Sequence, residues 1–215
     1  MRAHAALIAV AVAACAGRAR PAEPASRCGA AVVVAEQADV DALRGCARLG
    51  ALTIRTGASL DLSPLADLGA VDGVLTVGPT LQLASVSLPA LASVGAARIT
   101  ANGGLAAVYL PALRDAGALE VVDNVTLATW SSPALAVVTG DLTIARGGAL
   151  EVVDLSALAT VDGALRLEGV AALRVWLAPA LRRIGRLAVV APGLSLDDLA
   201  ALDAAQRGAP IAPPR

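Results

Sequence analysis

Few side chains in this sequence could perform acid–base or nucleophilic chemistry at neutral pH. The 215 residues contain one histidine, His4, and one tyrosine, Tyr109, and all 17 basic residues are arginines. Catalytic triads with histidine, Schiff-base lysines and histidine metal sites are therefore excluded beyond the first few residues. The net charge is −1, and no basic stripe offers a surface for nucleic acid. We expect no cofactor and no nucleic-acid partner.

Carboxylates are the remaining candidates for catalysis. Two carboxyl groups about 5–9 Å apart can cleave a glycosidic bond, and some enzymes that act on polysaccharides are β-helices. Asp123 with Asp154, or Glu120 with Glu168, could meet on neighbouring or alternate turns of such a fold. Solvated charges on loops and strands explain the same residues more simply. We therefore expect a protein that is not an enzyme, and keep a carbohydrate-active β-helix as the lesser alternative.

The N-terminal residues have the pattern of an export signal. Arg2 provides a positive start, and residues 5–14 form an apolar stretch too short to span a membrane. The stretch ends in Val-Ala-Ala-Cys, which resembles the bacterial lipobox, so we expect a signal peptide over residues 1–14 and lipidation of Cys15. The alternative is an ordinary signal cleaved nearby. Residues 15–27 are rich in Pro, Ala and charges and are predicted to be a flexible tether.

This resemblance implies a lipid anchor in the envelope of a bacterium. Acyl chains on one cysteine bind a membrane with about 0.8 kcal/mol per buried methylene. Residue 16 is alanine, not the aspartate associated with inner-membrane retention, which favours the outer membrane or cell surface.

Two further cysteines, Cys28 and Cys46, are 18 residues apart. In an exported protein such a pair most simply forms one disulfide. Two free buried thiols are the alternative. A metal site is disfavoured because two thiolates without histidine cannot complete a tetrahedral shell.

A motif of about twenty-two residues recurs through most of the chain, and such a period is typical of solenoids. Its first apolar pair, L-x-[IV], recurs every 22 or 23 residues. The pairs are Leu52/Ile54, Leu75/Val77, Ala97/Ile99, Leu119/Val121, Leu142/Ile144, Leu165/Leu167 and Leu187/Val189. A second apolar pair, V-x-L, follows in most turns, and then L-x-x-V. We predict a mainly β protein, a right-handed parallel β-helix of about six to seven coils with short capping helices at both ends, spanning residues 28–206.

Prolines and glycines mark the corners of each predicted coil. Prolines such as Pro89 and Pro111 follow the V-x-L pair and indicate a bend between faces. Glycines end the coils at 73, 95, 117, 140, 163 and 185, where we expect positive-φ corners. Ser195 is predicted to cap a helix whose Leu196, Leu199 and Leu202 cover the last coil. Residues 207–215 are expected to be a disordered tail.

The cysteine pair and the repeat together resemble the receptor L domain, the leucine-rich β-helix found in receptor ectodomains and in bacterial lipoproteins. The residues that carry this resemblance are Cys28, Val32–Val34, Gly45-Cys46 and the repeated L-P-A-L…V-x-G units. In receptors such domains bind protein ligands and are not catalytic, and the resemblance implies the fold without identifying the ligand. A plain leucine-rich repeat is the alternative, although its asparagine ladder is missing, since the chain has two asparagines, Asn102 and Asn124.

Alternation in the L-x-[IV] strand leaves one side of its sheet facing solvent. We predict a candidate binding face there, formed by Thr53, Arg55, Thr76, Arg98, Thr100, Glu120, Thr143, Arg166 and Glu168. Trp130 is predicted to point into the core. Trp176 fits the core in one register and the surface in another, and its exposed form joins the candidate face.

These observations predict a membrane-anchored surface lipoprotein whose solenoid binds an unidentified protein or glycan. A purely structural module that organises the envelope is the alternative.

Replacing Cys15 by alanine should release the protein from membrane fractions, because the acyl chains would have no attachment point. Fractionation of cells followed by immunoblotting measures this. Unchanged membrane association would contradict the lipid anchor.

Overall fold

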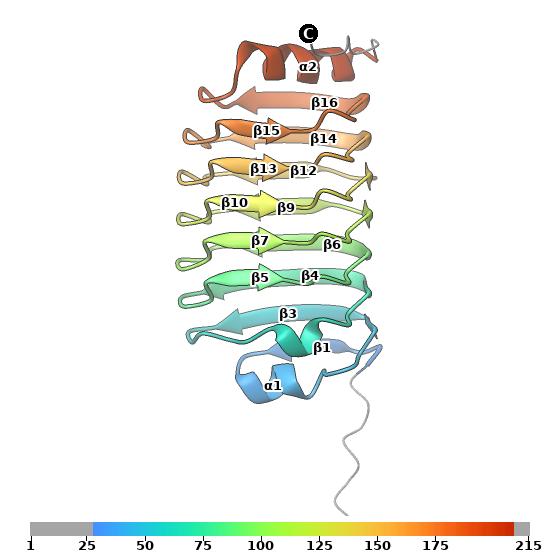
Figure 1. Ribbon diagram of the computed structural model, residues 1–215, viewed down its shortest axis with the longest axis vertical. Helices are drawn as coiled ribbons and strands as arrows, with labels where there is room; N and C mark the ends of the chain where they lie inside the picture. The colour runs from blue at the N-terminus through green and yellow to red at the C-terminus, as the bar shows by residue number, and fades with distance from the viewer. Residues whose placement is uncertain (1–27, 209–215) are drawn as a thin grey trace, which may run out of the picture.

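The structure is a computed structural model in which residues 28–208 are described, and it is a parallel β-solenoid of about seven turns (Figure 1). The predicted mainly β architecture with a helix at each end is confirmed. The predicted signal peptide, tether and Cys15 lie outside the described residues, as does the tail after Gly208.

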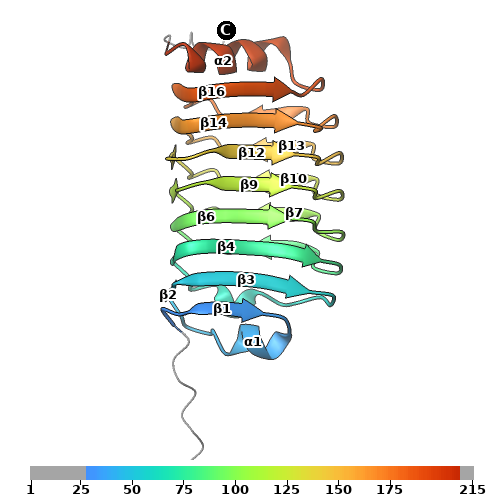
Figure 2. The ribbon, with the colours of Figure 1, turned by 180° about the vertical axis from the view of Figure 1, so that it is seen from behind.

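Two parallel sheets form the solenoid. The large sheet holds eleven strands: β1 (Ala31–Val34), β2 (Arg48–Leu49), β3 (Ala51–Thr56), β4 (Ala70–Thr80), β6 (Ser93–Thr100), β8 (Asp115–Ala116), β9 (Leu119–Val122), β11 (Val137–Val138), β12 (Leu142–Ala145), β14 (Thr160–Glu168) and β16 (Arg183–Val190). Figure 2 shows these strands from the side opposite to Figure 1. The small sheet holds five: β5 (Ser85–Ser87), β7 (Ala107–Tyr109), β10 (Thr129–Ser131), β13 (Val152–Asp154) and β15 (Val175–Leu177). A 3-10 helix, η1 (Ser63–Leu65), precedes the first small-sheet strand, and α1 (Gln37–Asp41) and α2 (Leu196–Gln206) lie at the two ends.

The interior is built from columns of aliphatic side chains, one member from each turn. Leu52 pairs with Leu75 and Leu75 with Ala97, and the same register continues to Leu187. Leu75, Leu119 and Leu165 are 0–3% exposed. Full burial of each leucine contributes about 1.5–3 kcal/mol. Because each column continues through all the turns, the turns share one core and no turn is stable alone.

The glycines that end the coils are required for close approach and not for positive φ. None of the six has a positive φ, so that prediction was wrong. They stack on one another instead: a Cβ added at Gly117 would lie 1.9 Å from the carbonyl oxygen of Gly95, and one at Gly140 would lie 2.6 Å from that of Gly117. Turns at this corner touch through their backbones. Positive φ occurs at a different corner, after the L-x-[IV] pair, at Ala101, Asp123 and Arg146.

A short polar ladder runs along three successive turns, although the asparagine ladder of a leucine-rich repeat is missing, as predicted. Thr80 donates to Oδ1 of Asn102 at 2.7 Å, and Nδ2 of Asn102 donates to Oδ1 of Asn124 at 2.8 Å. The two amides also donate to the backbone oxygens of Val77 and Ile99. All three side chains are buried. The ladder thus gives its buried polar side chains hydrogen-bond partners within the stack.

A disulfide between Cys28 and Cys46 closes the N-terminal cap, as predicted, with 5.2 Å between the Cα atoms. The loop between the cysteines holds β1 and α1. The side chain of Asp39 caps the N-terminus of α1 by accepting hydrogen bonds from the backbone N–H groups of Ala35 and Glu36. Constraining a loop of this size in the unfolded chain contributes about 3 kcal/mol.

The helix α2 covers the last turn, with one correction to the predicted inner face. Ser195 caps it by accepting a hydrogen bond from the backbone N–H of Asp198 at 3.1 Å. Leu202 is buried and Leu199 is partly buried, but Leu196 is 84% exposed. Leu194, which precedes the cap, fills the core position instead. Residues before the cap and in the second turn thus face the core, as in a hydrophobic staple.

Replacing Gly117 by alanine should lower the free energy of unfolding by at least about 2 kcal/mol, because the new methyl group meets backbone that cannot move without breaking the stack. Gly148 is the matched control: it has no atom within 4 Å of an added Cβ and no positive φ. Gly148→Ala should change stability by no more than about 1 kcal/mol. Urea unfolding measures both, and equal effects would contradict the stacking role.

Candidate functional site

The predicted binding face is a continuous surface of the large sheet. The parallel register places one outward residue from each of six turns in a single row: Thr53, Thr76, Arg98, Glu120, Thr143 and Arg166. Thr100 and Glu168 belong to a second row, two positions further along their strands. Arg55 lies beside the shift in register between β3 and β4. All nine side chains are exposed or half-buried, so the structure brings these residues together.

Charges of both signs lie on this face and at its corner, and two opposite-charge pairs form there. Nε of Arg98 lies 3.5 Å from Oε2 of Glu120. At the adjoining corner, Arg146 donates from Nε and Nη2 to the two carboxylate oxygens of Asp123, at 2.5 and 2.7 Å. This hydrogen-bonded pair lowers the pKa of the Asp123 carboxyl below its ordinary value and raises the pKa of the Arg146 guanidinium. The face therefore presents mixed and largely compensated charge, not a field of one sign.

Of the two carboxylate pairs proposed for catalysis, one is divided between the two sheets and the other lies on one sheet. Asp123 follows β9 of the large sheet, whereas Asp154 belongs to β13 of the small sheet. Glu120 and Glu168 lie on the same sheet, with β12 between their strands, and both act electrostatically on Arg146. Arg146 thus lies among three carboxylates, an arrangement that the sequence spacing did not reveal.

Both tryptophans point into the core, so Trp176 does not belong to the candidate binding face. Trp176 pairs with Val153 and is 7% exposed. The register that places Trp176 in the core is the one observed, and alternation along β15 turns Val175 and Leu177 outward. Trp130 is 1% exposed, as predicted, and its Nε1 donates to Oγ of Ser132 at 2.9 Å.

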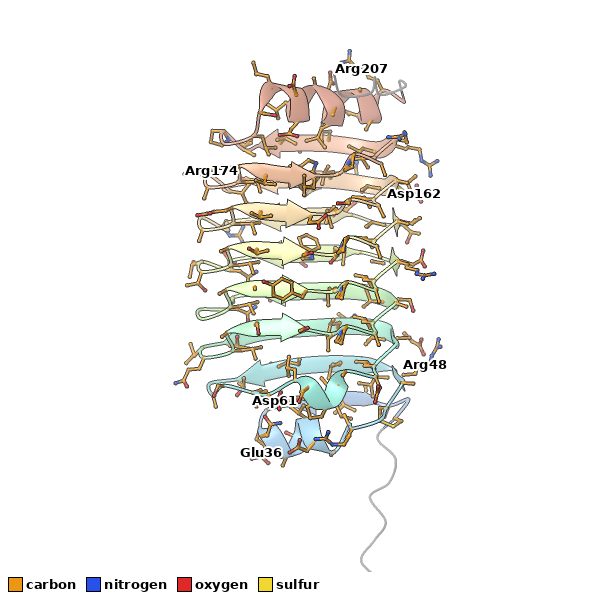
Figure 3. The ribbon with its side chains drawn as sticks, in the orientation of Figure 1. Glu36, Arg48, Asp61, Asp162, Arg174 and Arg207 are labelled. Carbon is orange, nitrogen blue, oxygen red and sulfur yellow. A yellow bond between two sulfur atoms is a disulfide. The ribbon has the colours of Figure 1, made fainter. Side chains whose placement is uncertain are left out.

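The small sheet has a second flat face, with a different composition. Its outward residues form two rows, Ser85, Ala107, Thr129, Val152 and Val175, and Ser87, Tyr109, Ser131, Asp154 and Leu177. Asp154 is the one charged residue among these ten. Tyr109 and Leu177 are each 44% exposed and Val175 is 39% exposed. In Figure 3 the labelled charged residues Arg48 and Asp162 lie along one edge of this face and Arg174 lies at the other.

The small-sheet face was not predicted, although the sequence carries a signal for it. Val86 and Leu88 of the V-x-L pair point inward, so Ser85 and Ser87 must point outward. The same counting applied to each turn gives the two rows. The L-x-[IV] strand has the stronger pattern, and the predicted binding face was drawn from that strand.

Two shallow hollows lie along the corner where the glycines stack. One, of about 250 Å³, is lined by Gly95 and Gly117 together with Asp72 and Asp115. The other, of about 430 Å³, adjoins Gly185 near the end of α2. Both arise because the glycine column has no side chains. Asp72 is already bound to Arg48, which lowers the pKa of its carboxyl, so this hollow does not bring two unpaired carboxylates together.

Within residues 28–208, no three His, Cys, Asp or Glu side chains lie close enough together to hold a metal ion. No helix in the same range is long and apolar enough to cross a bilayer. The chain matches no protein-family model, no curated protein and no solved structure. The resemblance to the receptor L domain and to bacterial lipoproteins therefore stays a prediction.

The ion pair at the solenoid corner should make a small, pH-dependent contribution to stability. Because the folded state lowers the pKa of Asp123, the pair stabilises the fold above the ordinary Asp pKa of about 4, and this contribution is lost as the pH falls through the lower folded value. Asp123→Asn removes the charge, and asparagine tolerates the positive φ of this position.

The melting temperature of the Asp123→Asn variant should therefore approach that of the wild type on acidification below about pH 4. Asp67→Asn is the control, since Asp67 makes no ion pair in the described part of the chain. A gap between wild type and Asp123→Asn that does not change with pH would contradict the assignment.

Proposed function

We propose that this protein is a membrane-anchored surface lipoprotein whose solenoid binds a partner through the small sheet and performs no catalysis. The observation that carries the proposal is the small-sheet face itself. Side chains that proteins usually bury are exposed there: Tyr109 on β7, and Val175 and Leu177 on β15, three strands further along the same face. Asp154 is the one charged residue among the outward residues of this face. Exposed apolar and aromatic residues gathered on one face are typical of recognition surfaces.

The rigidity of the face supports a binding role. The three central strands, β7, β10 and β13, each pair with a neighbour on both sides, so the backbone beneath the outward side chains is fixed. A surface that is already ordered loses little conformational entropy when a partner binds. Solenoids present such extended surfaces to partners.

The position of the N-terminus supports the anchoring part of the proposal. The described chain begins at the α1 end of the solenoid, and α2 lies at the other end (Figure 1). A lipid on Cys15 would attach at the α1 end through the predicted tether and leave both sheets accessible. The disulfide between Cys28 and Cys46 suits an oxidising compartment outside the cytoplasm.

A bulky charge in the middle of the small sheet should block partner binding. The variant is Thr129→Arg, in the Cys15→Ala background so that the lipid does not drive association. The matched control is Thr143→Arg on the large sheet, since both threonines are half-buried and face outward from inner strands. Sedimentation with isolated bacterial envelopes measures retention.

We expect saturable retention that Thr129→Arg weakens about tenfold or more and that Thr143→Arg leaves unchanged. Retention lost only with Thr143→Arg would assign binding to the large sheet and contradict the proposed face. Absence of saturable retention would contradict a binding role and favour a purely structural module.

A further inference from the structure

We infer that the small sheet binds an uncharged glycan and that the ring of Tyr109 is its stacking platform. The inference rests on the proposed function and specifies the ligand class that the face would take. The inference is supported by the position of the ring on a central strand between small side chains, by the hydroxyl groups around it and by the low charge of the face.

Tyr109 is the one aromatic side chain exposed among residues 28–208, because both tryptophans are buried and the chain has no phenylalanine. Its strand, β7, pairs with β5 on one side and β10 on the other. The residues directly beside it in the row are Ser87 and Ser131. Because these neighbours are small, they leave the ring face open, and the negative face of an aromatic ring attracts the weakly positive C–H groups on one side of a sugar ring.

Hydroxyl groups surround the ring on the same plane. Ser85, Ser87, Thr129 and Ser131 all face outward within one turn of Tyr109. Neither these four hydroxyls nor that of Tyr109 forms a hydrogen bond within the described part of the chain. Neighbouring strands are about 4.8 Å apart, a spacing comparable to the width of a sugar ring. A sugar stacked on Tyr109 would therefore hold its own hydroxyls over the adjoining serines, each of which can donate and accept.

The charge of the face favours an uncharged glycan over an acidic one. No arginine is among the ten outward residues of the small sheet, and the one charge, Asp154, is negative. Asp154 uses Oδ1 for the backbone N–H and the hydroxyl of Ser156, and Oδ2 is left to accept from a sugar hydroxyl. An acidic polymer would meet like charge without a compensating cation.

The surroundings of the ring also favour a glycan over a protein. A tyrosine that anchors a protein interface is usually enclosed by apolar groups that exclude water. Around Tyr109 the neighbours are hydroxyls and Ala107, while Val175 and Leu177 lie three turns away on β15. A ligand with many hydroxyl groups matches the polar, uncharged surroundings of this ring.

Native affinity electrophoresis of the full chain tests the inference. The gels contain dextran, laminarin or galactomannan as uncharged polymers and polygalacturonate as the acidic one. The variants are Tyr109→Ala, Tyr109→Trp and, as a control on the large sheet, Arg166→Ala. Both positions are exposed, and circular dichroism verifies that the three variants fold.

At least one uncharged polymer should retard the wild type, and Tyr109→Ala should weaken its binding about tenfold. Tyr109→Trp and Arg166→Ala should bind as the wild type does. The inference is overturned if no uncharged polymer retards the protein, if polygalacturonate is preferred, or if Tyr109→Ala binds unchanged. If it is overturned while Thr129→Arg still abolishes envelope retention, the binding role stands and the partner is of another class, such as a protein.

Discussion

Burial of aliphatic side chains in columns that run through every turn is the interaction on which the whole structure depends. Each inward leucine or valine packs on its equivalents in the turns before and after it, so the core is continuous from Val32 to Leu202. The columns align only if the turns are stacked in register, and the glycine corner permits this stacking because the backbones touch there. The two flat faces are a consequence, since inward packing at alternate positions forces the intervening residues outward.

Much of this fold follows from the period of the sequence. The L-x-[IV] pairs, the V-x-L pairs and the cysteine spacing predict the parallel sheets, the inward direction of the repeated aliphatic side chains and the N-terminal cap, because burial repeats with the same period as the apolar residues. The period does not show why glycine recurs at the end of each coil. The glycine column could mean positive φ or close contact, and only the positions of neighbouring backbones distinguish the two. The polar ladder was missed because two asparagines and a threonine look unrelated until the register aligns them.

The candidate site could be predicted only in part. The large-sheet residues form the expected row, but the pattern does not reveal that Arg98 meets Glu120 or that Arg146 meets Asp123, since long side chains choose partners in three dimensions. Trp176 was ambiguous because its neighbours Val175 and Leu177 mimic the inward V-x-L pair, and the pairing of β15 with β13 resolves the ambiguity. The low charge of the small-sheet face becomes visible only when outward residues from five turns are read together as one surface.

The position of the disulfide determines how mechanical load would pass through the molecule. A pull on the chain before Cys28 enters the domain at that residue and crosses the sulfur bridge to Cys46. The intervening segment, with β1 and α1, is a closed loop outside the path of the tension. The first strand therefore cannot be peeled from its neighbour by a load on the N-terminus, and the stress falls on the stacked turns beyond the bridge.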